Sequence, residues 1–433
     1  MTAGNRIYQS TAVFGISSRI LELSYVDRGE LDKELQRLLQ RPTHIALKGE
    51  SKCGKSWLRQ RNIPNAITVQ CRLNRTVLDL YVDALSQLGI RLTLETANRT
   101  GIKGTVEGTA EGGWSILAKV TAKVGGTVEK ERTEKTKPVG QDINDLRFIA
   151  DIIRESGRRL VIEDYHYLSQ HERAAFAFDL KALWDYECFV VIIGIWPENN
   201  MLLALNPDLS GRVTEVSIYW SSEDLYKIIL QGTKALNIEV SRPIAKRLVE
   251  DSFGTAGVLQ ALMLKMLDEQ GIEETGDQLR VLDEMKAYEH AAWSYADQLN
   301  AVYQSFASRV ARGIRARPNS TGIYAHSLAV ILDADDETLL KGMHLNDIYS
   351  QASEREPRVQ KGNLRQALDK MDELQIDDDG RGLVLTYDGN SGLMVVVDKQ
   401  LLFYRKYASV HWPWEQMVAS NDEKETLTFG GEK

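Results

Sequence analysis

The sequence contains few cysteines and prolines, and it has no long apolar run. Its three cysteines are too few for a disulfide framework or a zinc cluster. Nine prolines beside 32 glycines in 433 residues argue against a collagenous or wholly disordered chain. The longest strongly apolar run covers only residues 188–196, whereas a membrane-spanning helix needs about twenty residues. The amino-terminal residues also lack the basic start and apolar core of a secretory signal. We therefore expect a cytoplasmic protein with reduced thiols and no membrane span.

An excess of basic charge is also missing. The chain carries 53 Lys and Arg against 61 Asp and Glu, a net charge of −8, so any contact with nucleic acid has to come from a local patch. The hydrophobic and charged fractions, 43% and 26%, are those of an ordinary globular protein. At roughly 150 residues per domain, the length predicts two to four domains.

Apolar strands alternate with helical patterns over the first half of the chain. Predicted strands cover residues 44–48, 66–70, 160–162 and 189–193, with helices between them. This alternation is typical of a parallel α/β sheet, and we assign residues 1–215 to one such domain. Residues 95–140 interrupt it and are predicted to be an insertion. Apolar and small residues alternate between 106 and 124, which predicts a β-hairpin turning at 111–113. The insertion is either an ordinary hairpin packed on the domain, or an element for self-assembly or membrane contact.

The second half is predicted to be mainly helical. Apolar spacing predicts helices at 222–237, 242–251, 257–270 and 276–300, which together form a helical lid over residues 216–300. Two further helices, at 345–352 and 363–374, precede strands 383–387 and 393–397, which flank a turn at 388–392. Helices followed by a hairpin indicate a winged-helix-like domain over residues 301–433.

One motif follows the first predicted strand. It matches G-x-x-x-x-G-K-[ST] in full and lies between a strand and a helix, where a phosphate-binding P-loop belongs. In such a loop backbone N–H groups surround the phosphates, the lysine reaches the outer phosphates, and the hydroxyl ligates Mg²⁺. We therefore predict bound ATP and Mg²⁺. The motif residues are Gly49, Glu50, Ser51, Lys52, Cys53, Gly54, Lys55 and Ser56.

Two adjacent carboxylates follow the strand at 160–162. Hydrolysis by a P-loop protein needs an acidic residue at a strand end to hold Mg²⁺ and orient the attacking water. Glu163 is our candidate for the metal, together with Ser56, and Asp164 is our candidate for orienting the water. The alternative is that the pair belongs to a turn or caps a helix.

With these motifs the chain resembles the AAA+ and STAND branches of the P-loop ATPases, and most nearly the origin-recognition-like and transposon-regulator-like bacterial ATPases. The resemblance covers about residues 12–270 and rests on the segments 25–28, 49–56, 163–168 and 208–213. It implies a nucleotide contact for Arg28 and an arginine, Arg212, that reaches a neighbouring subunit's nucleotide. The alternative for Arg212 is a surface arginine in a connecting loop.

The sequence departs from that family at three points. The acidic pair reads Glu163-Asp164 where the family usually has Asp-Glu, so either carboxylate could polarise water. The strand after it ends apolar where a polar sensor is usual, and Asn199 or Asn200 could substitute. The lid also lacks the usual arginine. Because fewer charges remain to stabilise the transition state, we expect hydrolysis to be slow, as in a switch and not in a fast motor.

The partner of the C-terminal domain is left open by the sequence. Lys361, Arg365 and Lys370 lie on the predicted recognition helix, but acidic residues surround them. A basic stretch at 309–317 is the better candidate for DNA, although it could equally be a solvated helix face. We predict an oligomeric, slowly hydrolysing ATPase switch with a role in antiphage defence or mobile-element control, which the resemblance suggests. The alternatives are an ATP-licensed DNA-binding regulator or loader, and a protein that holds the nucleotide without turnover.

Overall fold

The computed structural model describes residues 6–98, 101–108, 111–123, 137–139, 143–196, 199–313, 321–376, 382–389 and 391–415. The chain forms two compact units. The first contains Met1–Val26, Glu50–Gly54 and Tyr219–Lys433, and the second contains Asp27–Gly49 and Lys55–Ile218. Each unit is considered by itself. Among the described residues, no helix combines the length and apolar character that crossing a membrane requires.

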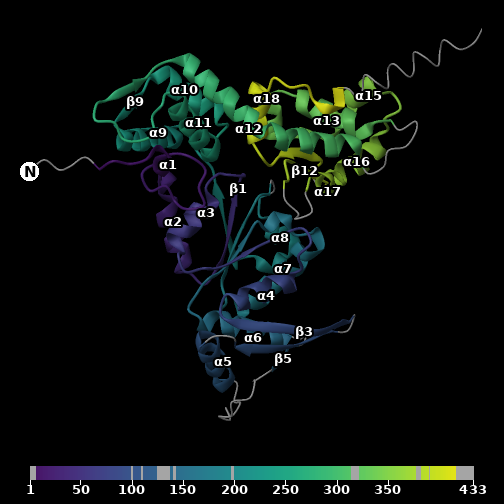
Figure 1. The fold of residues 1–433 in the computed structure, drawn as a ribbon. Coiled ribbons are helices and arrows are strands. Elements are labelled where there is room, and N and C mark those ends of the chain that lie inside the picture. The colour runs from purple at the N-terminus through teal and green to yellow at the C-terminus, as the bar shows by residue number, and fades with distance from the viewer. Residues whose placement is uncertain are drawn as a thin grey trace, which may run out of the picture. The chain divides into compact units, whose positions relative to one another are not determined.

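The second unit contains a five-stranded sheet, so the predicted parallel α/β fold is confirmed (Figure 1). All its strand pairs are parallel, and the order is β2-β6-β7-β1-β8. Every residue of β7 is buried, as expected of a central strand with both faces covered. The strands are β1 (His44–Gly49), β2 (Ile67–Gln70), β6 (Leu160–Glu163), β7 (Val190–Gly194) and β8 (Val213–Ile218).

Helices connect these strands. A capping box at Thr76 starts α4, and the Ser169 hydroxyl accepts a hydrogen bond from the Glu172 N–H at the start of α7. Outside the insertion, the described helices of this unit are α2 (Leu31–Leu39), α3 (Lys55–Asn62), α4 (Val77–Ser86), α6 (Ile143–Glu155), α7 (Gln170–Asp185) and α8 (Met201–Leu205), with 3₁₀ turns η1 (Arg28–Glu30), η2 (Tyr165–Tyr167) and η3 (Pro207–Leu209).

The insertion is built differently from the prediction. Its hairpin pairs β3 (Ile90–Asn98) with β4 (Gly101–Gly108), and β5 (Lys137–Val139) extends this antiparallel sheet. Residues 111–123, predicted to include a turn and a strand, form helix α5 (Glu111–Lys123). Leu117 and Val120, three residues apart, are buried, and a Cβ on Gly113 would lie 2.2 Å from the Gly89 carbonyl oxygen. The burial of Leu117 and Val120 follows helical spacing and not the apparent alternation. Residues 129–137 are charged at almost every position, which predicts a solvated arm, but of these residues only Lys137 is among the described ones.

The first unit contains the predicted lid helices and two strands that were not predicted. Helices α9 (Ser222–Leu236), α10 (Arg242–Asp251) and α11 (Ala256–Glu269) lie where expected (Figure 1). The prediction that residues 216–300 are helical throughout is wrong, because β9 (Ile238–Val240) pairs with β10 (Arg280–Leu282). The fourth helix, α12 (Met285–Arg312), therefore begins later than predicted and is longer. A short helix, α1 (Ser10–Val13), also belongs to this unit.

The C-terminal residues of this unit contain the predicted helices and hairpin. Strands β12 and β13 are antiparallel, and β11 adds to β13. The helix predicted at 363–374 is divided, because α16 ends before Lys370 and α17 follows it. The winged-helix identification and the three domain boundaries stay predictions. The elements are α13 (Ile323–Asp333), α14 (Asp336–Lys341), β11 (Met343–His344), α15 (Leu345–Arg355), α16 (Lys361–Asp369), α17 (Met371–Gln375), β12 (Leu385–Asp388), β13 (Leu393–Val396) and α18 (Gln400–Tyr407).

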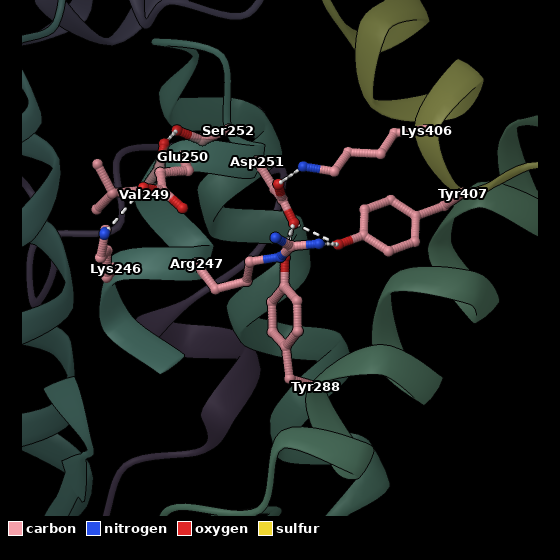
Figure 2. A network of polar contacts seen from close by, with 9 residues as sticks. All are labelled: Lys246, Arg247, Val249, Glu250, Asp251, Ser252, Tyr288, Lys406 and Tyr407. Atoms are coloured by element: carbon pink, nitrogen blue, oxygen red, sulfur yellow. Dashed lines mark hydrogen bonds and ion pairs between the residues drawn. The ribbon is translucent and has the colours of Figure 1, made fainter. Parts of the chain in front are cut away.

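A buried carboxylate connects the lid to the C-terminal helix within this unit (Figure 2). Asp251, at the end of α10, is fully buried. It accepts hydrogen bonds from the Tyr288 hydroxyl of α12 at 2.5 Å and from the Tyr407 hydroxyl of α18. Lys406 Nζ lies 2.6 Å and Arg247 Nε 3.1 Å from its oxygens. We call these five residues the Asp251 network. They satisfy a charge that would otherwise be costly to bury.

Candidate nucleotide and hydrolysis site

The P-loop has the predicted context of strand, loop and helix. Strand β1 ends at Gly49 and helix α3 begins at Lys55. Lys52 and Gly54 adopt positive φ angles of 56° and 86°, which let the loop turn tightly between them. The Lys55 Nζ donates to the Gly49 carbonyl oxygen at 2.9 Å. The Lys55 ammonium thus lies over its own loop, while Ser56 is exposed on the first turn of α3.

The two predicted carboxylates lie at the same edge of the sheet as this loop. Glu163 is the last residue of β6, and parallel strands bring their carboxyl ends together. Strand β6 does not pair with β1 directly, because β7 lies between them. Two strand spacings separate them by about 10 Å.

The two carboxylates have different surroundings. Glu163 is 5% exposed, and its Oε1 accepts a hydrogen bond from Arg59 Nε of α3 at 3.0 Å. Asp164 has a left-handed backbone with φ of 57°. Burial raises the pKa of the Asp164 carboxyl, the negative charge of Glu163 raises it further, and Lys55 opposes this shift. A carboxyl with a raised pKa accepts a proton more readily, as a group that orients water should.

The donor atoms in this region suit Mg²⁺. The ion prefers oxygen ligands and keeps several waters, so it needs only one or two carboxylates besides phosphate oxygens. The Ser56 hydroxyl and the Glu163 and Asp164 carboxylates provide such oxygens. Within the part of the chain that the structure describes, no cluster of three or more His, Cys, Asp or Glu side chains forms a self-sufficient metal site. The set therefore fits an ion that binds together with a nucleotide.

Inside the first unit, the P-loop is in contact with residues that no sequence pattern identified. The Ser51 N–H donates to the Val397 carbonyl oxygen at 3.5 Å, and Lys399 Nζ lies 2.6 Å from Glu50 Oε1. Lys52 Nζ lies 3.6 Å from Asp398 Oδ2 and also donates to Gln400. No motif or spacing in the sequence could have revealed these contacts, because about 350 residues of chain lie between the partners.

The lid also contacts the loop within this unit. The Trp220 Nε1 donates to the Cys53 carbonyl oxygen at 2.8 Å, and the Gly257 N–H donates to the Lys52 carbonyl oxygen at 3.1 Å. A Cβ on Gly257 would lie 2.7 Å from the Lys52 Cβ. The small residue at the start of α11 therefore allows this close approach.

The candidate sensors Asn199 and Asn200, the nearby His166 and the predicted nucleotide contact Arg28 have different surroundings. Asn199 Oδ1 accepts a hydrogen bond from Lys48 Nζ at 2.9 Å, and the Asn200 N–H donates to the Glu215 carboxylate. Burial, with smaller contributions from Lys55 and Arg173, lowers the pKa of His166 to about 3. His166 is therefore neutral at physiological pH. Arg28 is buried, at 7% exposed, in the turn η1.

Arg212 lies at the opposite end of the strands, where β1 begins and β8 is about to begin. Its backbone oxygen accepts from the His44 N–H at the start of β1, and its guanidinium stacks over the Trp184 ring at 4.9 Å. The P-loop follows the other end of β1, about 17 Å away along a six-residue strand. Arg212 is therefore placed away from the nucleotide loop of its own subunit.

Comparison with solved structures identifies the class of fold. No known family's sequence pattern and no curated protein matches this chain. A Walker-type ATPase of Pyrococcus abyssi is similar in structure, with a TM-score of 0.50 and 13% identity over 88% of this chain and 96% of that one. The Orc1 protein of Aeropyrum pernix, solved in complex with DNA, has a TM-score of 0.42 and 11% identity over 93% and 96%. A STAND protein of Pyrococcus horikoshii has a TM-score of 0.36 and 14% identity over 91% of this chain and 44% of that one.

The similarity to the Walker-type ATPase identifies the fold of this chain. This chain has the fold of the P-loop ATPases, as its resemblance to AAA+ and STAND proteins predicted.

Proposed function

We propose that this protein binds ATP with Mg²⁺ and hydrolyses it slowly, as a switch that couples nucleotide state to assembly. One observation carries the proposal: a complete P-loop and an acidic pair occupy the same carboxyl edge of one parallel sheet. In this proposal the loop amides and Lys55 bind the phosphates. Ser56 and Glu163 hold Mg²⁺, which neutralises charge on the transferring phosphoryl group. Asp164 orients the attacking water.

The contacts around the P-loop support a switch. The Ser51 N–H, which a bound phosphate would use, donates to Val397 in the C-terminal part. Lys52 and Glu50 are paired there with Asp398 and Lys399. Phosphates entering the loop would compete for the same N–H and ammonium groups, so nucleotide binding and release of residues 397–400 are linked. ATP is thereby coupled to the surface that the C-terminal part presents.

The position of Arg212 supports assembly in a head-to-tail manner. Because Arg212 lies beside the start of β1, far from the P-loop of its own subunit, any contact that it makes with a nucleotide would be in a neighbouring subunit. Such a contact is heterologous and closes into a ring or continues as a filament. The Arg212 guanidinium would neutralise charge on the neighbour's γ-phosphate during hydrolysis.

Mixing two inactive variants tests this proposal. Arg212→Ala and Asp164→Asn each remove a group that hydrolysis needs, but each leaves the other group intact. We expect each variant alone to lose at least about tenfold in phosphate release, since one transition-state contact is worth several kcal/mol. An equal mixture should recover part of the activity, and light scattering should show ATP-dependent assembly. A chain that is monomeric with and without ATP, with no rescue on mixing, would refute the switch.

An ATP-licensed DNA-binding regulator or loader is the second candidate. The Orc1 neighbour was solved with DNA, and the C-terminal part offers Lys361, Arg365 and Lys370 on and after α16. DNA binding that weakens steeply with salt and requires ATP would favour this candidate. Measuring phosphate release from ATP tests the third alternative, because a protein that holds ATP without turnover would release none. We also propose a role in antiphage defence or mobile-element control, and this part of the proposal is based only on the family resemblance of the sequence.

A further inference from the structure

A polar cavity of about 290 Å³ opens beside the acidic pair, within the second unit. It is far larger than the roughly 30 Å³ that one water molecule occupies in the liquid. Every residue that lines it is polar or charged, so it is suited to an ion and not to an apolar ligand. The lining residues are Arg59, Thr68, Gln70, Arg72, Arg75, Asp83, Gln87 and Glu163. We call this cavity the arginine pocket.

The three arginines outnumber the two carboxylates of the pocket, leaving one net positive charge. Arg59 pairs with Glu163, and Arg75 NH1 lies 3.6 Å from Asp83 Oδ2. Arg72 is exposed and has no hydrogen bond or ion pair from its side chain among the described residues. Its guanidinium presents five N–H donors without an acceptor. The excess charge is therefore concentrated on a group that is available to a ligand.

The backbone holds two of these arginines in one turn. The Arg75 N–H donates to the Arg72 carbonyl oxygen at 3.0 Å. The Thr76 capping box then starts α4 directly after the turn. On the other side, the side-chain amide of Gln87 accepts a hydrogen bond from the Thr68 N–H and donates one to the Thr68 carbonyl oxygen. The pocket walls are thus ordered by hydrogen bonds before any ligand arrives, which lowers the cost of binding.

We propose that the arginine pocket binds a phosphate-sized oxyanion, and that this ligand draws Arg59 away from Glu163. A tetrahedral oxyanion offers several acceptors, which suits converging guanidinium groups. Arg59 is shared between the pocket and the hydrolysis site, because its Nε donates to Glu163 while it also lines the cavity. An anion that takes over Arg59 leaves the Glu163 carboxylate with its full charge for the metal ion.

The second part of this proposal rests on the proposed function, since it assigns Glu163 to Mg²⁺. With the pocket empty, Arg59 competes with the metal for Glu163. With the pocket occupied, that competition is reduced, so the oxyanion should stimulate hydrolysis. Free phosphate and a phosphate ester share the chemistry that the arginines recognise, and the experiment separates them.

Binding is tested first, without any need for hydrolysis. The full chain carrying Lys55→Ala is titrated with inorganic phosphate in calorimetry at constant ionic strength, because this background weakens phosphate binding at the P-loop. We expect Arg72→Ala combined with Arg75→Ala to weaken phosphate binding at least about tenfold, the loss of one charged hydrogen bond or more. Arg41→Ala, an exposed arginine of the same unit outside the pocket, is the matched control and should bind normally.

Two results would overturn the site: phosphate affinity unchanged in the double variant, or no binding in the Lys55→Ala parent at tens of millimolar. Circular dichroism of each variant confirms that it is folded. Phenyl phosphate serves as the second probe. Binding of both probes assigns the pocket to phosphate esters, and binding of phosphate alone assigns it to the free ion.

Coupling is then tested in the chain with Lys55 intact. Sulfate, which is not a product of the reaction, should raise ATP hydrolysis several-fold, and the Arg72→Ala, Arg75→Ala variant should lose that stimulation while keeping its basal rate. Stimulation that persists in this variant would overturn the coupling. Phosphate binding without any ATP hydrolysis would leave the pocket standing and refute the proposed function. ATP hydrolysis without phosphate binding in the Lys55→Ala background would refute the arginine pocket and leave the proposed function standing.

Discussion

The Asp251 network allows the link between lid and C-terminal helix to be weakened in graded steps (Figure 2). Replacing Asp251 with Ala removes the acceptor for two tyrosine hydroxyls and two cations at once. A hydrogen bond to a charged group contributes about 1.5–3 kcal/mol. The side chains of Arg247 and Lys406 are 41% and 35% exposed, so solvent screens their ion pairs to at most about 1 kcal/mol each.

Together these contributions predict that Asp251→Ala lowers the free energy of unfolding by about 4 kcal/mol, allowing for incomplete additivity. The Tyr288 hydroxyl, in a fully buried residue, would lose its acceptor in this variant. Tyr407→Phe removes one hydrogen bond and keeps the ring, so it should cost about 1.5 kcal/mol. Asp251→Asn keeps one oxygen acceptor but loses the charge, and its cost should lie between these two.

Urea unfolding followed by circular dichroism measures these differences. Since the chain has two compact units, the transition that shifts should be that of the unit containing Asp251, and the other transition should stay in place. A matched control is Lys246→Ala, which removes an exposed ion pair with Glu250 on the same helix and should change stability by less than about 0.5 kcal/mol. If Asp251→Ala unfolds within that same margin of the wild type, the assignment of the network as a structural link is wrong.

Two further predictions concern the sheet and its loop. Lys55→Ala removes the ammonium that pairs with the phosphates, so ATP affinity in calorimetry should fall at least about a hundredfold, and unchanged affinity in a folded variant would contradict the site. Burial lowers the pKa of His44 from 6.5 to about 4, so between these pH values the unfolded chain binds more protons and stability should rise with pH. The total is about 3 kcal/mol. His44→Gln should flatten the dependence of unfolding free energy on pH in this window, and a slope equal to the wild type's would refute it.

The sequence was most informative where chemistry is local. A P-loop needs a strand, a glycine-containing loop and a helix start within about fifteen residues, and all of these lie between 44 and 62. Glu163 and Asp164 could be found in the same way, because the pair comes directly after the apolar residues 160–162. Their roles in catalysis stay predictions.

Short apolar patterns were less reliable. Residues 111–123 alternate like a strand but also place Leu117 and Val120 three residues apart, and both are buried in helix α5. The strands β9 and β10 are three residues each, too short to produce a periodic signal. The pairing of residues 397–400 with the P-loop depends on the folded arrangement of the first unit, which no local pattern encodes.

The positions of the three cysteines determine how each of them can react with an alkylating reagent. All three are buried, and none of them forms a disulfide. Burial raises the pKa of the Cys71 thiol, and it raises that of Cys188 to about 12, so neither forms the thiolate that alkylating reagents attack. Cys53 lies inside the P-loop itself and is 1% exposed. The chain thus contains a natural chemical probe at its nucleotide loop, with two silent neighbours as background. The rate at which Cys53 is alkylated measures how often that loop opens, and no label has to be introduced.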